Sequence, residues 1–154
     1  MLILELVLHC SDVSNPFKPF SICAEWADLV VAEFSSQGDR EKAEGLEVSP
    51  MMDRAQIVLC NMQMGFIEFV VSPLISNFIK AFPALYDIGE NITSNFTSWG
   101  EKRTREIQGD GSMDAATKAA EIAKIEGRIQ KFKEKQSYTD ELRDFIGGSN
   151  STNQ

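Results

Sequence analysis

The stretch DRAQIVLCNMQMGFIEFVVSPLISNFIKAF, residues 53–82, decides how the rest of the sequence is interpreted. It shows no sustained alternation of apolar and polar residues, which a half-buried strand would need. We therefore expect a long helix from about Asp53 to Phe82. Pro73 should end or kink this helix, because proline lacks the backbone N–H and its ring clashes with the preceding turn.

Helical patterns continue on both sides of this stretch. The segment Leu2 to Leu8 is apolar on every side except Glu5, which predicts a helix that is buried all round. Pro19 can open a second helix, residues 48–52 have no helical period and should form a loop, and Pro83 starts another helix. The expected fold class is all-α, a compact multi-helix array.

The C-terminal part predicts one more helix and a tail. Residues 109–112 form a clear break, and Ser112 can cap the helix that follows. Apolar residues recur there at intervals of three or four, namely Ala115, Ala119, Ile122, Ile125, Ile129 and Phe132. Such a stripe needs a partner surface, and we favour the same chain over a second chain. The composition of residues 147–154 predicts a disordered tail.

The overall composition narrows the classes of function. Fifteen basic against 23 acidic residues give a net charge of −8, which argues against a nucleic-acid partner. Three widely spaced cysteines and no basic leader favour reduced thiols and a cytoplasmic location. No segment appears long and apolar enough to cross a membrane, because the richest run, residues 57–74, contains Asn61, Gln63 and Glu68.

Asp12 is the first residue that could support chemistry. It follows an apolar helix, where an ionised carboxylate is costly unless a cation meets it. It could be a metal ligand, or it could turn the chain by accepting hydrogen bonds from nearby backbone amides. His9 is the only histidine, which excludes a self-sufficient histidine-rich metal centre. We expect His9 itself to be a core residue.

Gln63 is the second candidate. Its amide lies among apolar residues and must find hydrogen-bond partners or cost a few kcal/mol. Phe66 follows three residues later on the same helical face. An amide beside an aromatic ring can bind the edge and face of a flat heterocycle. The alternative is a core glutamine bonded to neighbouring backbone, with Phe66 as ordinary core.

Three ordered blocks of the sequence resemble the class I cyclic-nucleotide phosphodiesterases. They are HCSDVSNP at residues 9–16 with Lys18 and Pro19; Glu33-Phe34 followed by QGDRE at 37–41; and SPM at 49–51 with Asp53, then QMGFI at 63–67. The resemblance covers roughly residues 2–105. It implies an all-helical domain that hydrolyses cAMP or cGMP to the 5′ monophosphate with two divalent metal ions, zinc and magnesium or manganese.

The resemblance also implies a role for individual residues. Asp12 is similar to a metal ligand of that family, Gln63 to the glutamine that bonds the purine edge, and Phe66 to the ring that stacks on the base. Further residues are implied to line or support the base pocket, namely Val30, Asn15, Met51 and Trp26.

The resemblance is to the C-terminal half of the family's catalytic domain. The His-Asn-x-x-His block, a His-Asp pair and the proton-donating histidine of the family belong to an upstream half that this sequence lacks. We therefore expect an incomplete metal site, no activity of this chain alone, and the upstream half as a partner. The family packs this half against the upstream helices, so an apolar face including parts of Leu2 to Leu8 should be left uncovered. A homodimer is left open. The alternative is a non-catalytic helical module that binds a nucleotide or a partner. The expected division is 1–108, phosphodiesterase part; 109–146, helical extension; and 147–154, tail.

Overall fold

The computed structural model describes residues 2–136, and every regular element in that range is helical. The elements are α1 (Leu2–Asp12), η1 (Asn15–Phe17), α2 (Phe20–Ala43), α3 (Leu59–Phe66), η2 (Ile67–Val71), α4 (Ser72–Ala81), η3 (Pro83–Leu85), α5 (Tyr86–Gly109) and α6 (Ala115–Gln136). The all-α expectation is confirmed. The expected tail at 147–154 and the end of the extension near 146 lie outside the described residues.

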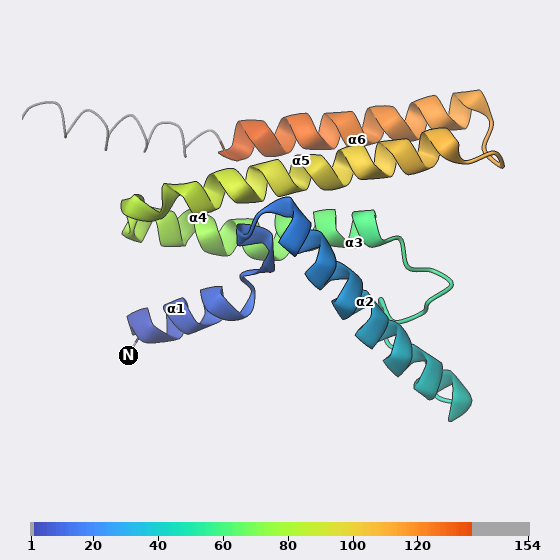
Figure 1. The fold of residues 1–154 in the computed structure, drawn as a ribbon, viewed down its shortest axis with the longest axis horizontal. Coiled ribbons are helices and arrows are strands. Elements are labelled where there is room, and N and C mark those ends of the chain that lie inside the picture. The colour runs from blue at the N-terminus through green and yellow to red at the C-terminus, as the bar shows by residue number, and fades with distance from the viewer. Residues whose placement is uncertain (1, 137–154) are drawn as a thin grey trace, which may run out of the picture.

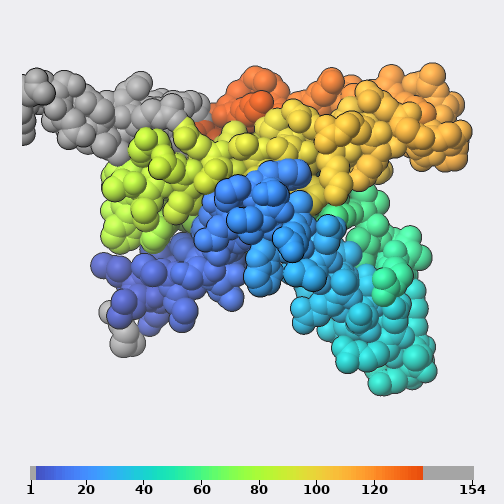
Figure 2. Space-filling view, in the orientation of Figure 1, coloured from blue at the N-terminus to red at the C-terminus, as the bar shows by residue number. Residues whose placement is uncertain are grey.

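The helices are arranged around α5, which contacts α2, α3, α4 and α6 (Figure 1). α6 lies antiparallel along one side of α5, and the line α3–η2–α4 runs along another. α2 extends away from this body, and the segment between α2 and α3 returns along it (Figure 1). The space-filling view shows the same projection (Figure 2). The core centres on the side chains of α5 and α3–α4, with the largest fully buried ones including Trp99, Phe96, Met64, Ile67 and Ile75.

The central helix begins six residues later than the sequence predicts. Asp53 accepts a hydrogen bond from the Ala55 amide at 3.0 Å, and its carbonyl accepts from the Gln56 amide at 2.9 Å. These bonds hold residues 53–56 in a turn, because an aspartate side chain competes with the helix for backbone donors. The helix therefore starts at Leu59.

Pro73 neither ends the helix nor produces a break. Proline cannot donate to the carbonyl four residues earlier, that of Phe69, and its ring would clash with it. The helix accommodates this by one π turn, η2, in which the Ser72 amide donates to the Ile67 carbonyl five residues back. A π turn inside an α-helix is rare and is frequent at functional sites.

Because the helix continues through Pro73, the expectation that no segment is long and apolar enough to cross a membrane is wrong. In the described part of the chain, the joined helix Leu59–Ala81 has 23 residues and is long and apolar enough to span a membrane by length and composition. However, 44% of its apolar window is buried inside the fold, and a buried core helix passes the same test.

α1 is a helix as predicted, but the expected burial all round is wrong. Leu4 and Leu8 are 73% and 72% exposed, and Ile3 and Val7 are exposed too. Among residues 3–12 of this helix, only Cys10 is fully buried. His9 is exposed and is not the core residue that the sequence favoured. The apolar face of α1 is therefore largely uncovered in this chain.

α6 packs on α5, which confirms the favoured prediction of a partner within the chain. Phe132 stacks on Phe96 with ring centroids 4.0 Å apart, and Ile125 is buried beside them. The stripe is shorter than predicted, because Ala115 and Ala119 are exposed. The predicted cap is also wrong: Asp114, not Ser112, accepts the first free amides of α6, at 2.9 and 3.0 Å.

Candidate functional site

A largely apolar cleft of about 630 Å³ lies where α1, α2 and α3 meet. It brings together every residue that the sequence singled out for a site: Asp12, Asn15, Trp26, Val30, Met51, Gln63 and Phe66. Gly65, between Gln63 and Phe66, also lines it. Residues that the sequence reasoning did not assign to the site complete the lining: Val13, Phe34, Asn61, Met62, Phe69 and Val70. Phe69 and Val70 follow Phe66 by three and four positions, so helical spacing from Phe66 could have found them.

Gln63 is the polar group at the wall formed by α3. The side chain is 5% exposed, and its Oε1 atom is buried with no hydrogen-bond partner. Buried amide oxygens are nearly always bonded, and an exception calls for an explanation. The alternative of a core glutamine satisfied by neighbouring backbone does not hold for this oxygen.

Two half-buried apolar side chains line the same cleft from different helices. Phe66 lies one turn after Gln63 on α3, and Val30 lies on α2. α2 is fixed against α5 by Phe20, whose ring meets Trp99 edge-on with centroids 5.1 Å apart. The positions of the two cleft walls are thus set by the core.

The turn η1 holds the polar end of the cleft. Asn95, a buried residue of α5, donates to the carbonyls of Pro16 and Lys18, both at 2.8 Å. Asn91 donates to the Phe17 carbonyl at 3.0 Å. These bonds fix the backbone next to Asn15, whose Oδ1 atom is buried without a partner. No sequence pattern pointed to the two supporting asparagines, because they lie more than 70 positions from the turn.

Asp12 lies at the rim of the cleft with an exposed side chain. No group of three or more histidine, cysteine, aspartate or glutamate residues among residues 2–136 is placed to hold a metal ion. Among the described residues, Asp12 is thus not part of a cluster of such side chains.

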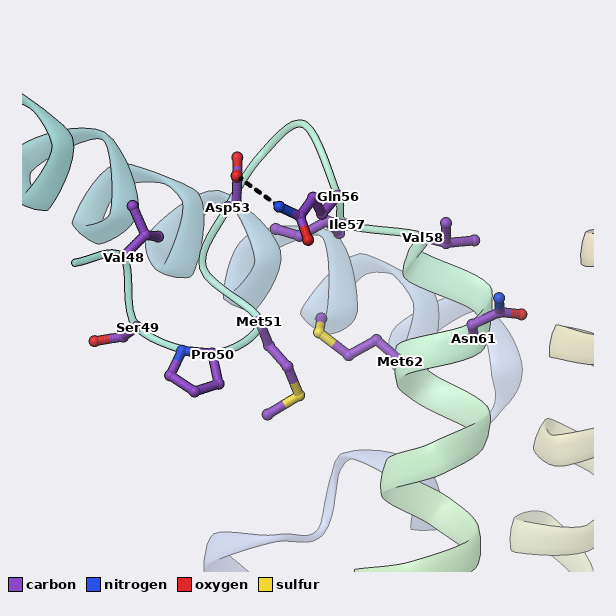
Figure 3. Close-up of a pocket in the computed structure, with 10 residues that line it drawn as sticks. All are labelled: Val48, Ser49, Pro50, Met51, Asp53, Gln56, Ile57, Val58, Asn61 and Met62. Atoms are coloured by element: carbon purple, nitrogen blue, oxygen red, sulfur yellow. Dashed lines mark hydrogen bonds between the residues drawn. The ribbon is translucent and has the colours of Figure 1, made fainter.

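The segment after α2 contributes Met51 to the lining of the cleft. Met51 adopts a positive φ of 65° and is 65% exposed. Figure 3 shows it on the loop facing α3, where Met62 lies, in a neighbouring hollow of about 510 Å³. The same view shows Gln56 donating to Asp53, at 3.1 Å. Met51, Met62 and Asn61 line both the hollow and the cleft.

This loop is tied to the end of α2 by charged groups. Glu41 accepts from the amide and hydroxyl of Ser49 at 2.7 and 2.8 Å, and these bonds hold the pKa of its carboxyl below the ordinary value. Lys42 pairs with Asp53 at 2.6 Å and lowers the pKa of Asp53. Gly38 is buried under the loop. An added Cβ there would lie 2.0 Å from the Met52 carbonyl oxygen, so only glycine allows the loop to approach α2 this closely.

Two of the three sequence blocks are therefore one structural unit. Residues 37–41 supply the glycine and the carboxylate that residues 49–53 need in order to place Met51 at the cleft. The remaining block, residues 9–16, contributes Asp12, Val13 and Asn15 to the lining of the cleft.

A family comparison identifies this arrangement. A model of the 3'5'-cyclic nucleotide phosphodiesterase family matches residues 1–92, more than half of the chain, including every residue that lines the cleft. The chain belongs to this phosphodiesterase family.

Relatives of this phosphodiesterase chain are similar over the same part. The human high affinity cGMP-specific 3',5'-cyclic phosphodiesterase 9A is 39% identical over 89 residues, which cover 57% of the chain and 15% of that protein. The mouse 3',5'-cyclic-AMP phosphodiesterase 4C is 42% identical over 72 residues, which cover 47% of the chain and 10% of that protein.

A solved structure shows the same fold. The structure of LmjPDEB1 in complex with IBMX is 37% identical, with a TM-score of 0.62, and the likeness covers 65% of the chain and 30% of that structure. The phosphodiesterase chain thus spans a minor part of each of these relatives. α6 begins at Ala115, beyond the family match.

Proposed function

We propose that this chain is part of a metal-dependent hydrolase that cleaves the 3',5'-cyclic phosphodiester of cAMP, cGMP or both to the 5' monophosphate. Its own contribution is the wall that binds the base, together with one metal-ligand aspartate. The observation that carries the proposal is the Oε1 atom of Gln63, buried without a partner at the edge of an apolar cleft.

The cleft suits a purine better than it suits a phosphate. The edge of a purine offers hydrogen-bond donors and acceptors, which would satisfy the Gln63 amide, and its faces are apolar. Phe66 and Val30 line the walls between which such a ring would lie. A side-chain amide has both a donor and an acceptor end and can be turned to match adenine or guanine. The net charge of −8 disfavours an unaided phosphate.

Asp12 lies at the rim where the phosphate end would project. In the intact domain we assign it as one ligand to a pair of divalent ions, zinc and magnesium or manganese. Such ions supply a hydroxide nucleophile at neutral pH when bound. Since the described residues offer only this one ligand, the 154-residue chain alone should be inactive.

The remaining ligands would come from the upstream half of the catalytic domain, which we propose as the partner. The exposed apolar face of α1, with Leu4 and Leu8, is a surface that this half would cover. We retain residues 1–108 as the phosphodiesterase part and 109–146 as a helical extension. The three free, buried cysteines support a cytoplasmic setting.

Titration of the isotope-labelled chain with cAMP and cGMP, followed by NMR, tests the base-binding wall. Gln63→Ala should weaken binding on the order of tenfold, because it removes a buried hydrogen bond to the base. The matched control is Gln130→Ala, an exposed glutamine on α6 far from the lining residues. The proposal fails if neither nucleotide perturbs the signals of the cleft residues, or if the two variants bind alike.

Kinetics of a longer phosphodiesterase containing this chain separate the two roles. Gln63→Ala should raise KM more than it lowers kcat, since the base contact is the same in ground and transition states. Asp12→Ala should abolish kcat through loss of metal. Equal kinetic defects in both variants would contradict the division into base wall and metal ligand.

A further inference from the structure

The π turn η2 has two sides with different surroundings. Phe69 and Val70 are 71% and 48% exposed and line the cleft. Ile67 and Val71 are fully buried in the core. Glu68 is half-buried and is bonded to α6. The turn therefore separates the cleft from the C-terminal helix, and a shift of its backbone would move part of the cleft wall.

Two side chains of α6 form hydrogen bonds with residues near the two ends of this turn. Arg128 donates through Nε to Glu68 at 2.7 Å, and the two side chains are only 32% and 25% exposed. Two turns further along α6, Gln136 donates to the hydroxyl of Ser72, and both residues are buried. Ser72 is also the residue whose amide closes the π turn.

α6 itself packs closely on α5, and Arg128 is part of that packing. The Arg128 guanidinium lies 5.8 Å from the centre of the Phe96 ring, which stacks on Phe132. At Gly100 the two helices approach so closely that an added Cβ would lie 2.6 Å from Cδ1 of Ile129. An arginine packed on an aromatic face loses little further freedom when it forms its ion pair.

We infer that α6 is a brace for the π turn and that Arg128 is a positioning residue for the nucleotide cleft. This inference rests on the proposed function and deepens it. A π turn is an uncommon helical geometry, and beside Pro73 the contacts from α6 at its two ends hold it in place. The brace comes from a segment beyond the family match, so affinity for the base depends on a helix that never touches the ligand.

The test uses the 154-residue chain and two readouts. The first is amide hydrogen exchange at Ser72, whose amide closes the π turn. The second is binding of cAMP and cGMP by NMR titration. Arg128→Ala should speed exchange at Ser72 and weaken nucleotide binding, each on the order of tenfold, as for a residue in a coupled network.

Matched variants separate a brace from general loss of packing. Lys124→Ala breaks an ion pair of the same helix, with Glu121, on its solvent side and should change neither readout. Glu68→Gln removes the ion pair but leaves Arg128 on the Phe96 ring, and it serves if Arg128→Ala does not fold. It should reproduce the faster exchange. The exchanged pair E68R/R128E should restore both readouts.

Each outcome decides a separate point. The first point is whether α6 holds the π turn. If the Ser72 amide exchanges no faster in Arg128→Ala and Glu68→Gln than in Lys124→Ala, the inference that α6 braces this turn is wrong. Faster exchange with unchanged nucleotide affinity overturns its action on the cleft. If the unaltered chain binds neither nucleotide, the proposed function fails, while the exchange data still decide whether α6 braces the turn.

Discussion

Replacing Gln63 by methionine should stabilise the fold while it destroys recognition of the base. The side chain is 5% exposed, and its Oε1 atom is buried without a partner. Methionine has about the same length and no amide, so the change removes an unsatisfied oxygen and creates no large cavity. Residues that serve binding are often suboptimal for stability, and this glutamine is a measurable case.

The size of the effect follows from the burial. An unsatisfied buried polar group costs about 1–3 kcal/mol. Since only one of the two amide heavy atoms is orphaned, we expect a gain in the free energy of unfolding of about 1–2 kcal/mol. For a chain of this length, that corresponds to a rise in Tm of about 2–8 °C.

Urea denaturation followed by circular dichroism measures this difference. The control is Gln136→Met, which makes the same substitution at a site 4% exposed, where the amide is bonded to the Ser72 hydroxyl. That variant should lose about 1 kcal/mol, because it breaks a satisfied hydrogen bond. A loss of stability in Gln63→Met, or equal changes of the same sign in both variants, would refute the reasoning.

Three further predictions concern activity, packing and pH. The 154-residue chain supplied with zinc, magnesium or manganese should not hydrolyse cAMP or cGMP, and turnover that disappears in Asp12→Ala would contradict this. Phe132→Ala should destabilise the fold by about 3–5 kcal/mol in urea denaturation, because the ring is buried against Phe96. The exposed neighbour Lys131 is the control: Lys131→Ala should change stability by no more than about 0.5 kcal/mol, and similar values for both variants would show that α6 does not pack on α5. Burial, with the Glu106 carboxylate nearby, raises the pKa of the Cys60 thiol from 9.0 to about 12. Because the unfolded chain ionises first, this contribution to stability is complete below pH 9 and is lost as the pH rises to about 12, and a Cys60→Ala variant that shows the same fall would disprove it.

The sequence predicted the helices well and their ends poorly. Pro19 and Pro83 marked where α2 and the η3–α5 segment begin, and the spacing of apolar residues located α6, because a helix must bury one face and this leaves a period in the chain. The start of α3 was missed because the side chain of Asp53 captures a backbone amide, a local competition that apolar spacing does not register. The expectation that Pro73 could end the helix was wrong, because the π turn just before it lets the helix continue to Ala81.

The sequence blocks predicted the residues that line the site. They did not predict the residues that hold those lining residues in place. Residues from 9–16 and 49–67 line one cleft, and residues 37–41 hold the loop that carries Met51. Asn91 and Asn95 could not be found from sequence, since they act on a turn more than 70 positions away. The same holds for Arg128, whose partner Glu68 lies 60 positions away.

The sequence by itself determined that the chain is helical, which face of α6 is apolar, and which side chains are suited to a flat heterocycle. These are properties of residue type and near neighbours, which the chain specifies locally. Only the tertiary structure decided that the Gln63 oxygen has no partner and that α6 reaches the turn behind the cleft. Hydrogen-bond satisfaction and exposure depend on what lies opposite in space, and the groups that meet there come from distant parts of the chain.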